Sequence, residues 1–191
     1  MKGNAEHETR RHLESGESLL WSGVPKQGIF LRASDSFMIP FSLLWGGFAF
    51  FWEYVVITKG ASLLFVLFGV PFVLIGLYII AGRFFVDAKM RANTYYALTD
   101  RRAIIVSGLF TQSTNSIPLR TLHDISLKER RDRTGTVILG RSNPLNDLYS
   151  GIQWPDMSQF RVPSFERIDN AKYVHDQILQ AHRAENQKAA S

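Results

Sequence analysis

The chain has 191 residues, of which 46% are apolar, a net charge of +5 and no cysteine. The apolar fraction is ordinary for a globular protein, and the absence of cysteine agrees with a reducing compartment. The mild positive charge, with no basic tract interleaved with aromatic residues, excludes nucleic acid as the expected partner and suits a protein beside an anionic leaflet.

The first 36 residues are predicted to be an N-terminal segment outside the lipid. Residues 1–16 are polar and rich in charge, which predicts a mobile tail with no more than a frayed helical turn. Residues 18–23 form a short apolar segment that ends at a turn around Pro25. Trp21 lies too far from the next apolar stretch to belong to it, so it either packs on the folded domain or rests among lipid headgroups.

Residues 37–82 read as a hairpin of two membrane-spanning helices. Residues 37–57 and 61–81 are apolar, three residues separate them, and Glu53 and Lys59 are the only charged side chains in the range. Each stretch reaches the roughly 20 residues that a helix needs to cross about 30 Å of hydrocarbon. The alternative, a buried helical pair in a soluble protein, is disfavoured because neither stretch carries a polar stripe.

Small residues and one acid mark the interior of this hairpin. Gly69 and Gly76 are seven residues apart and so share a face, and we expect them to face Gly46 and Gly47 across the hairpin. Glu53 admits two interpretations. It either reaches interfacial water near the outer end, or it lines the centre of an oligomeric transport or channel subunit.

Basic residues predict the orientation of the hairpin. They are abundant before and after it, whereas only Lys59 lies in the link, so both termini are expected in the cytoplasm. Residues 83–92 are predicted to be a basic juxtamembrane linker, and its candidate lipid contacts are Arg83, Lys89 and Arg91.

The period of the pattern changes after residue 92 and predicts a small α+β domain over residues 93–185. Strands are expected at residues 94–98, 103–107, 111–117, 122–127, 136–139, 152–154 and 160–162. Asp169 is a candidate helix cap, and the apolar residues behind it recur at helical spacing: Ala171, Val174, Ile178 and Ala181. Short strands closed by one helix are typical of a barrel or sandwich, and residues 186–191 are predicted to be a disordered tail.

Several of these segments resemble the bacterial pleckstrin-homology-like (PH-like) domains. The resemblance is carried by Tyr-Ala-Leu-Thr-Asp-Arg-Arg at residues 96–102, Gly-Leu-Phe at 108–110, Ile-Pro-Leu at 117–119 and the stretch from Phe165 to Val174. Upstream, residues 16–23, 40–48 and 82–87 are similar to a membrane-anchored version. The resemblance implies a partly open barrel of two orthogonal sheets, capped by the C-terminal helix and anchored in the bacterial inner membrane, without enzymatic activity.

A basic cluster between the later strands is the candidate contact site. Its members are Arg120, Lys128, Arg130, Arg131, Arg133 and Arg141. If several of them share one loop, they could bind an anionic lipid headgroup or an acidic partner. The alternative is a solvated turn whose charges pair locally and contribute little.

The sequence contains no motif that predicts catalysis. We find no nucleophile elbow, dinucleotide fingerprint or phosphate loop, and the five histidines have no metal-ligand spacing. No cofactor or metal is therefore expected. The prediction is a non-catalytic module, anchored in the bilayer, that engages a protein partner, a second copy or the anionic membrane surface; the alternative is the oligomeric transport or channel subunit.

Overall fold

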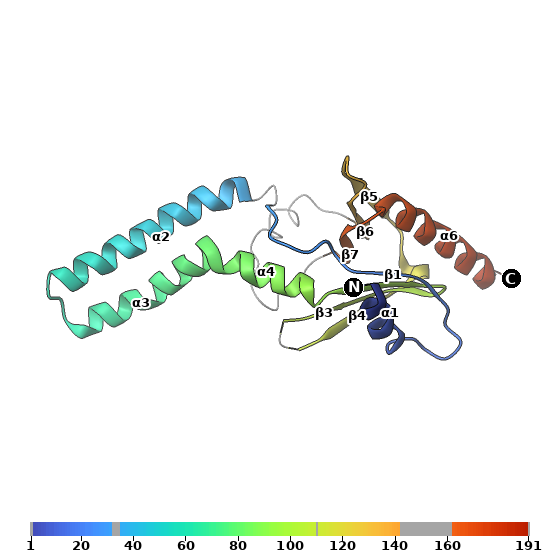
Figure 1. Cartoon of the computed structure of the whole chain (residues 1–191), viewed down its shortest axis with the longest axis horizontal. Helices are drawn as coiled ribbons and strands as arrows, with labels where there is room; N and C mark the ends of the chain where they lie inside the picture. Colours follow the sequence, from blue (N-terminus) through green and yellow to red (C-terminus); the bar gives the residue numbers. More distant parts are fainter. Residues whose placement is uncertain (1, 32–34, 110, 142–161, 191) are drawn as a thin grey trace.

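The computed structural model describes residues 2–31, 35–109, 111–141 and 162–190. A long helical hairpin forms one end of the molecule, and two small sheets with their covering helices form the other (Figure 1). The strand predicted at residues 152–154 and nearly all of that at 160–162 lie outside the described residues.

The hairpin consists of α2 (Asp35–Thr58) and α3 (Leu63–Leu77), which pack along each other. α3 continues through a π-helical segment, η1 (Tyr78–Gly82), into α4 (Arg83–Ala92). By length and composition, Asp35–Thr58 and Leu63–Ala92 are both able to cross a membrane. The predicted linker at residues 83–92 is therefore a helix that continues the second arm of the hairpin.

Two glycines let α2 and α3 approach each other closely, as predicted. A Cβ atom on Gly76 would lie 3.1 Å from the Cα atom of Gly46, which is backbone and cannot give way. Gly69 faces Glu53 on the opposite helix. Gly69 and Gly47 therefore differ from the prediction, since Gly69 meets an acid instead of a glycine and a Cβ atom at Gly47 would meet nothing within 4 Å. The hairpin is thus packed through a narrow line of small residues.

The first sheet is antiparallel, in the order β1–β2–β3–β4. Its strands are β1 (Leu19–Gly23), β2 (Tyr95–Thr99), β3 (Arg102–Ser107) and β4 (Ser113–Pro118). β1 comes from the N-terminal segment and pairs with β2 across the whole hairpin, with Trp21 opposite Leu98. The domain boundary predicted at residue 93 leaves out this strand, because five residues carry too weak a local pattern to reveal a distant partner.

The second sheet is also antiparallel and contains β5 (Ile125–Glu129), β6 (Gly135–Leu139) and β7 (Ser164–Ile168). A 3-10 turn, η2 (Leu119–Thr121), joins the two sheets. β5 therefore begins three residues later than the strand predicted at residue 122. The two sheets are separate and open, and they do not form a closed barrel.

The C-terminal helix α6 (Ala171–Ala190) closes the core between the sheets. The four apolar residues predicted for its inner face are all buried, against Phe165, Leu98 and Val137. Trp21 stacks on Phe165 with ring centroids 5.6 Å apart, so it packs on the folded domain rather than among headgroups. α6 also continues to Ala190, beyond the predicted end at residue 185.

The predicted mobile tail at the N-terminus contains a helix instead. α1 (Lys2–Arg10) contacts β1 and β2, and the side chain of Thr9 is fully buried. A second apolar cluster lies on this side of the first sheet, where Leu13 and Leu19 pack against Ile104 and Val106. Sheet packing therefore stabilises a segment whose own sequence is only weakly helical.

Substituting Gly76 tests the glycine packing. Gly76→Ala should destabilise the hairpin by about 1–3 kcal/mol, because its Cβ atom would press on the Gly46 backbone. Gly47→Ala is the matched control, since that site is open and alanine brings the same gain in helix propensity. Steric trapping in lipid bicelles would measure the free energy of unfolding of both variants. Equal changes in this free energy for Gly76→Ala and Gly47→Ala would contradict the packing.

Candidate functional site

The junction between the hairpin and the sheets is built around a buried ion pair. Arg83 Nη1 lies 2.7 Å from Asp35 Oδ1, with both side chains less than a tenth exposed. Asp35 begins α2 and Arg83 begins α4, so the pair joins the two arms of the hairpin at its foot. A buried charge is costly unless it is paired, so each residue holds the other in place.

Arg91 forms a second buried centre two turns farther along α4. It pairs with Asp87, and its Nη2 donates a hydrogen bond of 2.7 Å to the carbonyl oxygen of Gly28. Gln27 Nε2 donates in turn to the Arg91 carbonyl oxygen at 3.2 Å. Arg83, Asp87 and Arg91 are spaced four residues apart and therefore lie on one face of α4. This face contacts Gly28 in the segment after β1 and Asp35 at the start of α2.

The aromatic ring of Phe30 ties the same segment to the second sheet. Arg91 and Arg167 place their guanidinium carbons 5.2 and 4.3 Å from the ring centroid. Arg167 Nη2 also donates to the Leu31 carbonyl oxygen, and the Arg167 carbonyl oxygen accepts a hydrogen bond from the Lys26 backbone. We call residues 24–31 together with α4 the stem, because they lie between the hairpin and the two sheets and are bound to each other.

The three predicted juxtamembrane contacts differ in their surroundings. Arg83 and Arg91 are buried in the stem and paired with acids, whereas Lys89 is exposed on the other side of α4. The spacing of Asp87 and Arg91, four residues apart, is a local sign of their pairing, whereas the contacts with Asp35 and Gly28 come from a distant part of the chain.

The six residues of the predicted basic cluster do not share one loop. Arg130, Arg131 and Arg133 lie at the exposed turn between β5 and β6. Arg141 follows the far end of β6, a strand of five residues that spans about 16 Å at about 3.3 Å per residue. Lys128 is on β5, where its side chain has a partner of its own.

Arg120 is engaged by the C-terminal helix. Its Nη2 and Nε atoms donate to Glu185 Oε1 at 2.6 and 2.9 Å, and Glu185 is buried. A guanidinium held by a shielded carboxylate keeps α6 against η2. Arg120 is therefore bound within the fold, although its side chain is 59% exposed. Arg130, Arg131 and Arg133 of the β5–β6 turn are exposed as well, as is Arg141.

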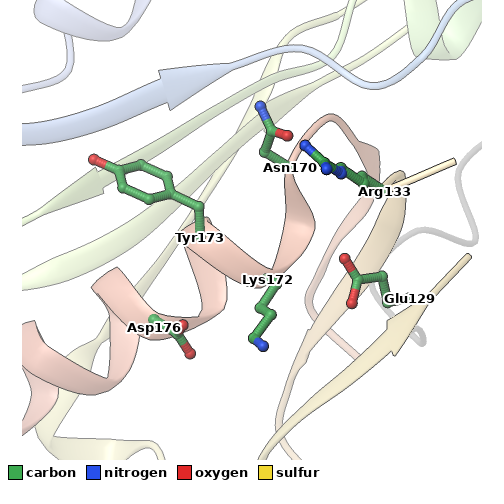
Figure 2. A pocket seen from close by; sticks show the side chains of 6 residues that line it. All are labelled: Glu129, Arg133, Asn170, Lys172, Tyr173 and Asp176. Carbon is green, nitrogen blue, oxygen red and sulfur yellow. The ribbon is translucent and has the colours of Figure 1, made fainter. Parts of the chain in front are cut away.

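A shallow open hollow of about 480 Å³ adjoins this turn, between the ends of β5 and α6. Figure 2 shows the Arg133 guanidinium directed toward Asn170, and the Glu129 carboxylate on the side of Lys172. The remaining lining residues are Tyr173 and Asp176. Two acids and two bases leave the hollow without one dominant charge, and apart from Arg133 the sequence pattern indicated none of its residues.

A third buried ion pair holds the N-terminal segment on the first sheet. Glu17, whose side chain is fully buried, accepts hydrogen bonds of 2.9 Å from Arg102 Nε and Nη2 and of 2.7 Å from Thr99 Oγ1. Burial by itself would raise the pKa of Glu17. The hydrogen bonds from Arg102, the Glu14 backbone and Thr99, with the charge of Arg102, outweigh it and lower the pKa from 4.5 to about 2.

Glu53 faces its own hairpin. Its carboxylate lies against Gly69, and its Oε2 atom is buried without a hydrogen-bond partner among the described residues. Elsewhere in the described part of the chain, no group of three His, Asp or Glu side chains is placed to hold a metal ion.

Among known protein families, a family model described as Bacterial PH domain matches residues 38–181, from the first turn of α2 into α6. The match covers the hairpin, the stem helix and both sheets except β1, and it confirms the resemblance seen in the sequence. The comparison with curated proteins and that with solved structures each found no match.

The pair at the foot of the hairpin can be tested by a double-mutant cycle. Asp35→Asn or Arg83→Met alone should cost about 3–5 kcal/mol of unfolding free energy, because each leaves a buried charge unpaired. The double variant should cost less than either single change. Glu6→Gln is the control, since the exposed Glu6–Arg10 pair should be worth less than about 1 kcal/mol. Additive effects at Asp35 and Arg83 would contradict the pairing.

The low pKa of Glu17 predicts a dependence of stability on acid. A carboxylate with a lowered pKa stabilises the fold fully above its ordinary value of 4.5, and this contribution is lost as the pH falls toward 2. Denaturation of the full chain at pH 7, 4.5 and 3 should show that Glu17→Gln loses about 2 kcal/mol at pH 7 and that its deficit shrinks at pH 3.

The neighbouring residue Glu14 supplies the control. It also meets Arg102, but its side chain is 66% exposed, so Glu14→Gln should change stability little at any pH. A deficit of Glu17→Gln that stayed constant from pH 7 to pH 3 would show that the carboxylate is not the stabilising form.

Proposed function

Because the chain belongs to the bacterial PH domain family, we propose that it is a membrane-anchored, non-catalytic binding module of the bacterial inner membrane. α2 and α3 cross the bilayer as a hairpin, and the two sheets lie on the cytoplasmic side with both termini. There the domain engages a protein partner or the anionic membrane surface.

The observation that carries this proposal is the surface of the hairpin. Many of its large apolar side chains point outward, as in Leu44 and Leu64, which are 77% and 78% exposed. The buried positions are mostly small residues: Ser42, Gly46, Ala49, Gly69 and Gly76. A soluble protein seldom exposes a continuous apolar surface of more than a few hundred Å². This arrangement suits helices surrounded by lipid and disfavours the alternative of a buried pair in a soluble protein.

The stem explains how an anchor could serve a binding module. The hydrogen bond from Arg91 to the Gly28 carbonyl oxygen and the ring of Phe30 between Arg91 and Arg167 bind residues 24–31 to both α4 and β7, while the Asp35–Arg83 pair binds α2 to α4. A fixed domain meets the leaflet with one defined side, and this preorganisation reduces the entropy lost on binding. A long flexible tether would not provide such an orientation.

The exposed turn between β5 and β6 is the proposed contact for an anionic ligand. Arg130, Arg131 and Arg133 are exposed there, and none forms an ion pair within the described residues. The acid between them, Asp132, is drawn to Lys26 at 3.3 Å and to Thr134. Basic side chains that are not neutralised locally are suited to phosphate or carboxylate groups.

The transport or channel alternative receives less support. It requires several hairpins around a pathway, with Glu53 at the centre. The Glu53 carboxylate lies between its own two helices, against Gly69, so it would line a shared pathway only after the helices separate.

Reporter fusions test the anchoring and the orientation together. A fluorescent protein fused after Ser191 should fluoresce, and alkaline phosphatase should be inactive there but active when inserted after Lys59 in the link. The untagged chain should stay with the membrane in alkaline carbonate. Active phosphatase after Ser191, or release by carbonate, would overturn the proposal.

A further inference from the structure

Exposed apolar side chains outside α2 and α3 gather at the foot of the hairpin. Among the described residues, the large apolar side chains that are exposed elsewhere in the chain are Leu20, Ile29, Leu31, Phe85 and Tyr173. Three of the five belong to the stem, where Ile29, Leu31 and Phe85 are 58%, 64% and 67% exposed. Tyr173 is 58% exposed and Leu20 is 44% exposed. Isolated apolar residues on a surface are normal, but this concentration beside two apolar helices is not.

Ile29 and Leu31 stay exposed because the stem binds the Phe30 side chain between them and the neighbouring backbone carbonyl groups. Phe30 is turned inward between the guanidinium groups of Arg91 and Arg167. The carbonyl oxygens on either side, those of Gly28 and Leu31, are bound by the same two arginines. The segment therefore cannot turn over to bury its two aliphatic side chains without breaking these contacts.

Phe85 is the exposed large apolar side chain of α4. It stands one turn from Lys89, which is also exposed, while Arg83, Asp87 and Arg91 occupy the buried face. The chain changes direction at η1, and Figure 1 shows α4 bent away from the line of α3. The start of α2 and the start of α4 lie at the same end of the hairpin, where Asp35 pairs with Arg83.

We propose that Ile29, Leu31 and Phe85 form an apolar collar that enters the interfacial layer of the leaflet crossed by the hairpin. This inference rests on the proposed function, because the occupant of the collar is the bilayer itself. The collar continues the apolar surface of the two helices past the buried Asp35–Arg83 pair. Lys89, one turn beyond Phe85, then lies at the depth of anionic headgroups, as basic residues at helix ends do.

The collar gives the module a fixed distance from the membrane as well as a fixed orientation. Residues 24–31 are bound to both α4 and β7. Insertion of the collar into the leaflet therefore also fixes the position of the second sheet relative to the membrane. The contact does not depend on recognition of one lipid species, since it is made by apolar side chains at the acyl boundary.

Single-cysteine labelling of the full chain tests the collar directly, because the natural sequence contains no cysteine. Ile29→Cys, Leu31→Cys and Phe85→Cys would each carry the fluorophore NBD in vesicles of phosphatidylethanolamine and phosphatidylglycerol. Lipids with a nitroxide near the headgroup end of the acyl chain should quench these labels several-fold more than labels at Leu20→Cys and Tyr173→Cys. The two control sites are apolar and exposed, but lie on β1 and α6.

A label at Leu64→Cys, within α3, separates the two possible failures. If that label is quenched by nitroxide lipids while the three collar labels match Leu20 and Tyr173, the hairpin is inserted and the collar is overturned alone. If the Leu64 label is not quenched either, the hairpin is outside the bilayer, and both the proposed function and the collar are overturned. Quenching at Leu64 and at all three collar positions is the expected result.

Discussion

Arg83 and Arg91 lie two turns apart on one face of α4, and each is withdrawn from water by a carboxylate. Asp35 reaches Arg83 from the start of α2, and Asp87 reaches Arg91 from within α4. A buried guanidinium without its carboxylate would be an unpaired charge, which is costly. The start of α2 therefore cannot move away from the start of α4. The spacing of the hairpin arms and the path of the chain from β1 both depend on this requirement.

The same arrangement makes the N-terminal segment part of the domain. β1 pairs with β2 across more than 70 intervening residues, and Trp21 completes the core by stacking on Phe165. Glu17 holds the approach to this strand through Arg102 and Thr99. The hairpin therefore interrupts a folded unit. This connection differs from an anchor attached to the end of a domain, because both ends of the hairpin are fixed to the sheets.

The basic residues fall into two groups. Arg83, Arg91 and Arg120 are structural, since Asp35 and Glu185 reach Arg83 and Arg120 from distant parts of the chain and Asp87 binds Arg91 from the same helix. The arginines of the β5–β6 turn and Lys89 are available at the surface. Our proposals for membrane and partner contacts use the second group and the apolar residues of the collar. The net charge of the chain says little about either group.

Local pattern was sufficient for some elements and failed for others for identifiable reasons. The hairpin could be predicted because span length and lack of charge are properties of a continuous stretch. The inner face of α6 could be predicted because Ala171, Val174, Ile178 and Ala181 repeat with the helical period. In contrast, α1 is weakly helical by itself, and the continuation of α6 past residue 185 is stabilised where Glu185 meets Arg120.

The candidate site shows the same division. The basic residues, the apolar stretches and the family resemblance could be recognised from the sequence, because these are properties of neighbours along the chain. The separation of Arg141 from the β5–β6 turn also follows from the strand predicted at residues 136–139. In contrast, the fold is needed to show that Arg120 is bound and that Ile29 and Leu31 stay exposed. Both outcomes depend on a partner far away in sequence, Glu185 or Arg167, and no local periodicity encodes such a contact.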